Sequence, residues 1–181
     1  MTRKLSILVI FFSLLIPARS LAQADKNQDI WAPFKFFVGK WEGRGEGKPG
    51  ISTGKQEFQF ILGGKYLHVK NEARFEPQRN NPAGQIHEDW GFFSYDQARK
   101  KYVLRQFHME GFVNQYLCES CGEDGKTFTF VSEQIENIPA GWRAKLTYKI
   151  LNENEFQQSF DLAAPEKEYD CYSVGIMKRL K

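Results

Sequence analysis

Long apolar runs are scarce in this sequence, and their scarcity excludes one class of protein. The longest run covers residues 5–16, where nearly all of the 12 positions are apolar. A helix needs about 20 such residues to cross a bilayer. Pro17 follows directly and ends the run, so we expect no membrane-spanning helix in the mature protein.

The flanks of this run give it a different meaning. Arg3 and Lys4 precede it, and the small-residue segment Ala22-Gln23-Ala24 follows it before the chain becomes polar. A basic start, a short apolar stretch and an A-x-A site are the three parts of a secretory signal peptide. We therefore predict cleavage of residues 1–24. Residues 25–181 should be exported as a single domain and act as a secreted or periplasmic protein.

An excess of charge of either sign is also missing from the predicted mature chain. The full sequence holds 25 Lys and Arg against 22 Asp and Glu, and three of the basic residues lie within residues 1–24. The 22 basic and 22 acidic residues that remain cancel, so the net charge favours neither nucleic acid nor an anionic membrane as a partner. A small molecule or a protein is the expected partner.

Familiar motifs of metal and phosphate chemistry are absent. The sequence has neither an HExxH motif nor a phosphate-binding loop. Its three histidines, His68, His87 and His108, fall in three separate segments, and alternation places His68 on an outer face. We predict no catalytic residue and no metal site. Residues 86–90 could supply an acid, a base and an aromatic wall to an enzyme, but neighbouring side chains of a strand point to opposite faces.

Turn-forming residues recur at short intervals along the mature chain and separate segments with strand composition. The connections are too short for the crossovers that parallel strands need, so adjacent segments should pair antiparallel. Closure removes the exposed edges of such a meander. The predicted fold is all-β, an antiparallel up-and-down barrel. Its ten strands are expected near residues 40–46, 54–62, 65–76, 85–95, 101–109, 112–118, 126–134, 142–151, 154–162 and 168–179.

Alternation within these segments predicts which side chains point into the barrel. A barrel of this size can enclose a pocket with apolar walls and a few polar anchors. The apolar segment 30–38, with Asp29 at its start, should form a short helix that closes one end. The predicted ligand-binding residues are Trp41, Phe58, Phe60, Leu67, Trp90, Phe92, Tyr116, Trp142 and Tyr148, with Arg105 and His108 as polar anchors.

Cysteine is rare, and its three copies are unusually placed. Cys118 and Cys121 precede a turn that contains acidic residues, and Cys171 lies near the C-terminus. Acidic neighbours oppose the lowered thiol pKa of a redox-active pair, and no fourth ligand is spaced to complete a zinc site. In an oxidising compartment we expect one structural disulfide. This disulfide joins either Cys118 to Cys121 or one of these two to Cys171, and we favour the pair Cys118 and Cys121.

Several segments resemble known barrels. Gly39-Lys40-Trp41 matches the G-x-W of the opening strand of calycins, the superfamily of lipocalins and fatty-acid-binding proteins. With residues 60–67, 95–103 and 125–130, the chain resembles a family of bacterial lipocalin-like domains. Residues 37–47 are also similar to nitrobindin-type haem-binding barrels of ten strands. That resemblance implies a haem-ligating histidine on a late strand, whereas this chain has no histidine after His108.

Together these features predict a secreted, non-catalytic barrel without a cofactor that binds a small hydrophobic or amphipathic molecule. Three alternatives make different predictions. A haem-binding barrel would take up haem in solution. A barrel-type cyclase or isomerase would hold a buried titratable group with a shifted pKa beside its pocket. A structural barrel would have a filled interior and an exposed apolar patch that binds another protein.

Overall fold

The computed structural model describes residues 29–79 and 81–181, and the predicted signal peptide, residues 1–24, lies outside them. The described residues form one short 3-10 helix, η1 (Ala32–Phe37), and ten strands. The strands are β1 (Gly39–Gly47), β2 (Ser52–Ile61), β3 (Tyr66–Phe75), β4 (Gln85–Asp96), β5 (Lys101–His108), β6 (Val113–Cys121), β7 (Thr127–Glu136), β8 (Arg143–Asn152), β9 (Glu155–Ala163) and β10 (Asp170–Arg179).

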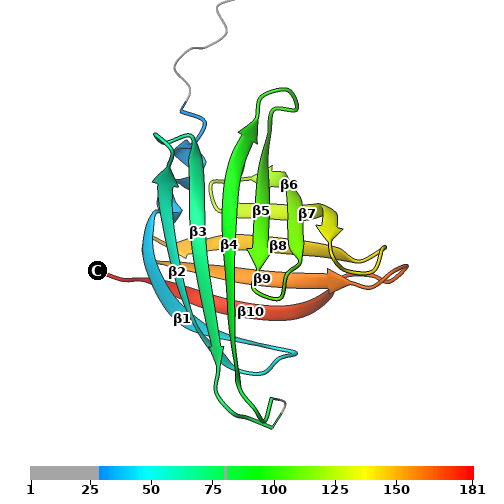
Figure 1. Cartoon of the computed structure of the whole chain (residues 1–181). Coiled ribbons are helices and arrows are strands. Elements are labelled where there is room, and N and C mark those ends of the chain that lie inside the picture. The colour runs from blue at the N-terminus through cyan, green and yellow to red at the C-terminus, as the bar shows by residue number, and fades with distance from the viewer. Residues whose placement is uncertain (1–28, 80) are drawn as a thin grey trace, which may run out of the picture.

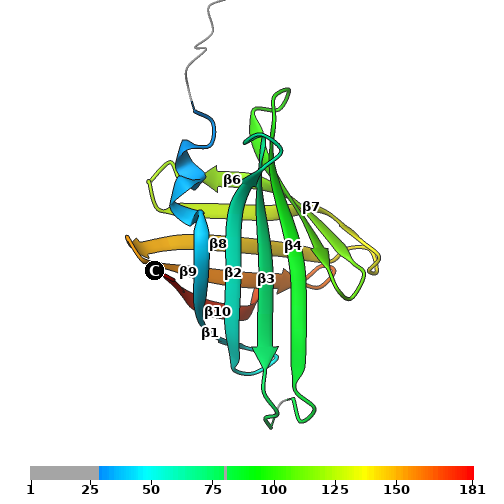
Figure 2. The ribbon, with the colours of Figure 1, turned by 60° about the vertical axis from the view of Figure 1, so that its left-hand side comes forward.

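The strands form a closed antiparallel barrel, in which each strand pairs with its neighbours in sequence and β1 pairs with β10 (Figure 1). The predicted all-β, up-and-down barrel is therefore confirmed. Strands β1 to β4 run upright in Figure 1, and β8 to β10 cross behind them; the turned view in Figure 2 shows the same two directions. Among the described residues, no helix is both long enough and apolar enough to span a membrane.

The first and last strands approach closely at a run of alternating glycines on β1. A Cβ atom on Gly43 would overlap the backbone carbonyl of Ile176, and one on Gly47 would overlap that of Tyr172. Only glycine, which has no Cβ, permits this distance between the two backbones. The G-x-G-x-G pattern of residues 43–47 therefore has a structural role, because it lets β1 close the barrel against β10.

Helix η1 closes one end of the barrel, as predicted. Its Phe34 and Phe37 are buried, together with Trp31 just before it. The carboxylate of Asp29 accepts a hydrogen bond of 3.0 Å from the backbone N–H of Trp31. The Phe34 ring lies 4.8 Å from Tyr102 and 5.2 Å from Phe128, between ring centroids. Burial of large aromatic side chains on this scale makes the η1 end the main hydrophobic core.

The tryptophan of the G-x-W motif ties this helix to the barrel wall. Trp41 Nε1 donates a 2.7 Å hydrogen bond to the carbonyl oxygen of Phe37. The Arg179 guanidinium lies 4.1 Å from the centre of the Trp41 ring and donates to the carbonyl oxygen of Val38 at 2.8 Å. The start of β1 and the end of β10 are thus joined next to η1.

The favoured cysteine pairing is present in the structure. Cys118 and Cys121 form a disulfide within β6, where a register shift between Cys118 and Ser120 marks a β-bulge against β7. Cys118 is part of the buried core. Cys171 is exposed, and it forms no disulfide within the described part of the chain.

Candidate functional site

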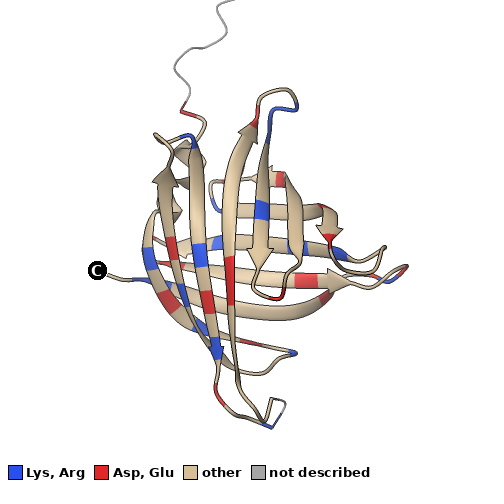
Figure 3. Cartoon of the chain, in the orientation of Figure 1, with Lys and Arg blue, Asp and Glu red and all other residues tan. Residues whose placement is uncertain are grey.

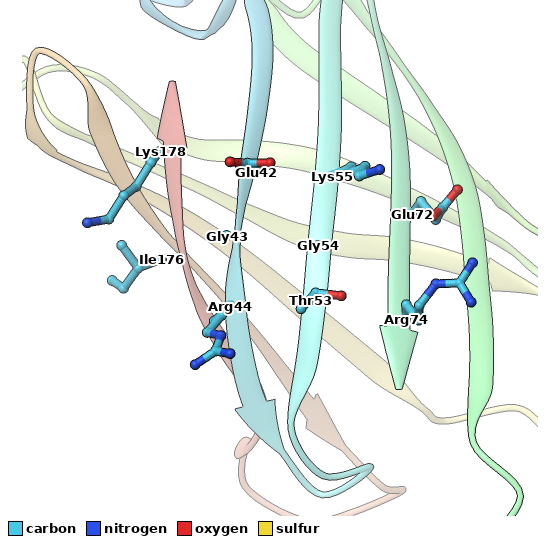
Figure 4. A pocket seen from close by; sticks show the side chains of 10 residues that line it. All are labelled: Glu42, Gly43, Arg44, Thr53, Gly54, Lys55, Glu72, Arg74, Ile176 and Lys178. Carbon is cyan, nitrogen blue, oxygen red and sulfur yellow. The ribbon is translucent and has the colours of Figure 1, made fainter. Parts of the chain in front are cut away.

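A groove of about 620 Å³ crosses the outer face of β10, β1, β2 and β3 (Figure 4). Its side chains alternate in sequence with buried residues such as Trp41. The groove contains cross-strand neighbours of opposite charge, in the order Lys178, Glu42, Lys55 and Glu72. Such neighbours stabilise a sheet surface, and Figure 3 shows both signs of charge along these strands. The residues of the groove therefore have a structural explanation, as a row of alternating charges on the outer surface of the sheet.

The interior of the barrel offers a more specific arrangement. On four adjacent strands, the inward positions are apolar near η1 and become polar toward the opposite end. From the η1 end outward, these positions are Leu67, Val69 and Asn71 on β3; Phe93, Gly91, Asp89 and His87 on β4; Leu104, Gln106 and His108 on β5; and Cys118, Tyr116 and Asn114 on β6. We call this end of the interior the polar half and the η1 end the aromatic half.

Asp89 lies at the centre of the polar half and is 5% exposed. Its Oδ1 accepts hydrogen bonds from Asn71 Nδ2 at 2.6 Å and from Gln106 Nε2 at 2.7 Å. Its Oδ2 lies 3.5 Å from His87 Nε2. Hydrogen bonds to a carboxylate are about twice as strong as those between neutral groups. The two amides therefore fix the carboxylate with its second oxygen toward the histidines.

His87 and His108 meet beside this carboxylate. His108 Nδ1 lies 3.5 Å from His87 Nε2, and His87 Nδ1 lies 2.7 Å from Glu110 Oε1. The hydrogen bond to Asp89 raises the pKa of His87 to about 9, burial opposes this shift, and Glu110 adds to it. Burial is the main cause that lowers the pKa of His108 to about 4. At neutral pH the pair therefore consists of one charged and one neutral imidazole.

The neutral imidazole is held by two further side chains. The His108 ring stacks on Phe112, with centroids 4.0 Å apart. Asn114 Nδ2 lies 3.1 Å from His108 Nε2 and donates a 2.8 Å hydrogen bond to the Tyr116 hydroxyl. Burial raises the pKa of Tyr116, so its hydroxyl stays neutral. Among the described residues, Asn71 Oδ1 and Asn114 Oδ1 are buried without a hydrogen-bond partner.

The predicted ligand-binding residues do not all share one site. Those that fill the aromatic half are Trp41, Phe58, Phe60, Leu67 and Tyr148. Tyr116 and His108 belong to the polar half. The remaining four, for which we predicted an inward orientation or an anchoring position, are Trp90, Phe92, Arg105 and Trp142.

The predicted inward position is wrong for Trp90, Phe92 and Arg105. Trp90, Phe92 and Arg105 lie on the outer face of β4 and β5, where Trp90 is 45% exposed. Strand β4 carries aromatic residues on both faces, so alternation alone does not decide which face is inside. Trp142 lies just before the first residue of β8 and is 38% exposed, so it is not part of the buried interior.

Sequence reasoning considered His87 and Asp89, within residues 86–90, but did not assign them to a site. It missed the other polar groups near His108, which are Asn71, Gln106, Glu110 and Asn114. The outward position predicted for His68 agrees with the structure, since His68 alternates with buried Leu67 and Val69. A signal for the rest was present in His87 and Asp89, which are two residues apart and so share one face of a strand.

Comparison with known proteins identifies the family. The family model for the THAP4-like, heme-binding beta-barrel domain matches residues 31–179. At the level of the family, this match supports the resemblance to haem-binding barrels of ten strands. No curated protein matches the chain.

A solved structure shares the fold, and two designed barrels give lower scores by the same measure. Rv2717c from M. tuberculosis superposes with a TM-score of 0.62 at 16% identity, over 85% of this chain and 99% of that one. A redesigned β-barrel and a de novo fluorescence-activating β-barrel each give a TM-score of 0.42, at 11% and 13% identity, over 81% and 80% of this chain and 93% and 94% of theirs. The sequence match over residues 31–179 shows that the chain belongs to the THAP4-like, heme-binding beta-barrel domain family.

Proposed function

We propose that the protein binds haem in the polar half of its barrel, with His108 as the iron ligand. The family match favours this alternative over an unspecified hydrophobic ligand. The observation that carries the proposal is the neutral, largely buried imidazole of His108, whose pKa is lowered to about 4 by burial. A neutral imidazole keeps a lone pair free to bind iron.

The source of the imidazole differs from the one that the resemblance implies. The inward positions on β10 are Ser173, Gly175 and Met177, so the last strand offers no histidine to the interior. His108 supplies an imidazole from β5 instead. His87 is the weaker choice, because Asp89 and Glu110 lie against its two ring nitrogens. Both carboxylates favour the protonated imidazole, which has no lone pair for iron.

The surroundings of His108 also suit a bound cofactor. Phe112 and Tyr116 provide aromatic surface, and the buried amide oxygens of Asn71 and Asn114 have hydrogen-bonding capacity to spare. His108 would hold the haem, the haem iron would supply the binding chemistry for a small ligand, and the polar side chains around it would tune what is bound.

Titration of the purified protein with hemin tests this proposal. We expect one equivalent to bind with a shift of the Soret band, and His108→Ala to abolish that shift. His68→Ala is the matched control, because His68 lies on the outer face and should leave the band unchanged. Absence of a Soret shift in the wild type would overturn haem binding. An unchanged band in His108→Ala would overturn the assignment of the ligand.

A small amphipathic molecule is the second candidate ligand. The support comes from Gln56 Oε1, Asn71 Oδ1 and Asn114 Oδ1, which are buried acceptors without partners among the described residues. A ligand with hydroxyl or amide donors would satisfy them. Native mass spectrometry of protein purified from its own compartment distinguishes the two candidates, since haem and an organic ligand add different masses.

A further inference from the structure

We propose that His87, Asp89 and His108 form a binding site for a divalent transition-metal ion in the polar half of the barrel. One nitrogen or oxygen atom from each of the three residues lies within 4.8 Å of the others. His87 Nε2 is 3.5 Å from both His108 Nδ1 and Asp89 Oδ2. This site goes beyond haem binding, because it needs no porphyrin.

Two of the three spacings between donor atoms match those of a metal site, and the third is within 4.8 Å. Ligand atoms that bind Zn²⁺ tetrahedrally at about 2.0–2.2 Å lie about 3.3–3.6 Å from one another. The two distances of 3.5 Å from His87 Nε2 fall within this range. Two imidazoles and one carboxylate leave a fourth position for water or substrate, as in catalytic zinc sites and in non-haem Fe(II) sites.

Each of the three ligands is oriented by a second residue. Glu110 binds the far nitrogen of His87 at 2.7 Å, which is the carboxylate–histidine–metal arrangement common in metal sites. Asn71 and Gln106 hold Oδ1 of Asp89 and leave Oδ2 free for an ion. These contacts orient the donor atoms of His87 and Asp89 before any ion arrives.

The orientation of Asn114 provides an independent indication. Its Nδ2 faces His108 Nε2 at 3.1 Å, while its Oδ1 is buried without a partner. The nitrogen and oxygen of an amide are assigned from their surroundings and can be exchanged by a half-turn of the group. With that half-turn, Oδ1 accepts the Nε2 proton of His108. At that position Oδ1 also lies within reach of the Tyr116 hydroxyl, and Nδ2 takes the buried position that Oδ1 held. The Nδ1 lone pair of His108 is then free for the proposed metal ion.

The local charge also favours a cation. Asp89 and Glu110 are both acidic, and within residues 29–79 and 81–181 neither forms an ion pair with Lys or Arg. An ion that binds His87 displaces the extra proton that this imidazole carries at neutral pH, since metal ligands must be deprotonated. With both imidazoles neutral, the two carboxylates carry two negative charges, which a divalent ion cancels. The His87 side chain is 26% exposed, which gives an ion a path from solvent.

Haem and a bare ion place different demands on these residues. The porphyrin supplies four nitrogens to haem iron, so the protein contributes one donor on each face. Three protein donors that converge on one point instead suit an ion without a porphyrin. The two ligands would compete for His108, but only the bare ion needs Asp89.

Calorimetric titration of the EDTA-treated, dialysed protein with Zn²⁺ tests the proposal. We expect one equivalent to bind. His87→Gln, Asp89→Asn and His108→Gln should each weaken binding by more than the roughly 10–100-fold loss that a change outside the ligand shell causes, and Glu110→Gln should fall within that range. His68→Gln and Cys171→Ser are the controls for an exposed histidine and an exposed thiol, and both should bind like the wild type.

Co²⁺ gives a second readout, since its visible absorption reports ligand number and type. The proposal is overturned if the wild type takes up no Zn²⁺, if the three ligand variants bind it as well as the wild type, or if His68→Gln or Cys171→Ser abolishes binding. Glu110→Gln keeps all three ligands and so remains informative should a ligand variant fail to fold. Asp89→Asn separates this site from haem binding, because it should lose Zn²⁺ and keep the hemin Soret shift.

Discussion

The aromatic half and the polar half of the barrel interior are built on the same strands but from opposite chemistry. In the aromatic half, Phe37 lies 5.1–5.6 Å from the ring centroids of Phe58, Phe128, Tyr148 and Phe156. In the polar half, Asp89 is surrounded by amides and imidazoles. One half excludes water and ligands, whereas the other presents donors and acceptors.

This division shows how a small barrel can use one set of inward residues for stability and another set for binding. Buried polar groups with unfilled hydrogen-bonding capacity are costly, so a barrel tolerates them where a ligand gains from them. The rigid aromatic half fixes the strands that carry His87, Asp89 and His108. If this separation is correct, substitutions in the two halves should have different consequences.

The largest effect on stability is expected from Phe37→Ala. Removal of a fully buried aromatic ring costs about 3–5 kcal/mol of unfolding free energy, since a cavity replaces its contacts. Urea unfolding followed by tryptophan fluorescence measures the loss. Phe107→Ala, at an outer position that is 47% exposed, is the control and should cost much less. Similar losses in the two variants would contradict the placement of the core.

Asp89→Ala should lower the unfolding free energy less than Phe37→Ala does, and it should weaken Zn²⁺ binding more. Its amide partners Asn71 and Gln106 lose their acceptor, and an unsatisfied buried group costs about 1–3 kcal/mol. The same urea titration gives this value, and the Zn²⁺ titration should show no binding. A stability loss as large as that of Phe37→Ala would mean that the polar half also serves as core, and the division between halves would fail.

The aromatic half was far easier to predict from sequence than the polar half. Its strands alternate between apolar and polar residues, so Trp41, Phe58 and Tyr148 were assigned to the interior and lie there. Turn residues gave the strand boundaries to within a few positions, and short connections gave the antiparallel order. These signals are local in sequence, and each acts on its own strand.

The polar half depends on contacts between strands, which no local pattern reports. Asp89 faces inward opposite His108 only because β4 and β5 pair in a particular register. The inward polar residues also break the alternation rule, since Asn71 and Gln106 occupy positions where apolar residues are expected. Predictions from periodicity therefore fail where a buried site replaces the core.

The disulfide offers a smaller test on the aromatic side. Cys118 and Cys121 are three residues apart, and the loop entropy of so short a ring corresponds to about 2 kcal/mol of unfolding free energy. We expect the double variant Cys118→Ser, Cys121→Ser to lose about this amount while it still binds Zn²⁺ like the wild type. Loss of Zn²⁺ binding in a folded double variant would show that the two halves are coupled.

The pH dependence of stability in the metal-free protein tests single groups of the polar half, since one titrating group changes stability by at most about 1.4 kcal/mol per pH unit. The pKa of His87 is raised from 6.5 to about 9. The contribution of His87 to the unfolding free energy is therefore complete below pH 6.5 and is lost as the pH rises through 9. The pKa of His108 is lowered from 6.5 to about 4. Its contribution is present above pH 6.5 and is lost as the pH falls through 4.

The two histidines thus oppose each other, and stability in the presence of EDTA should be greatest near pH 6.5. His87→Gln should remove the alkaline decline, and His108→Gln should remove the acid decline. Unfolding free energies measured by urea titration between pH 4 and 9 test this pattern, because groups elsewhere in the protein contribute equally to all three proteins and cancel in the differences. Parallel curves for the three proteins would show that the imidazole pair is not coupled to folding, and the polar half would then be a solvated rim.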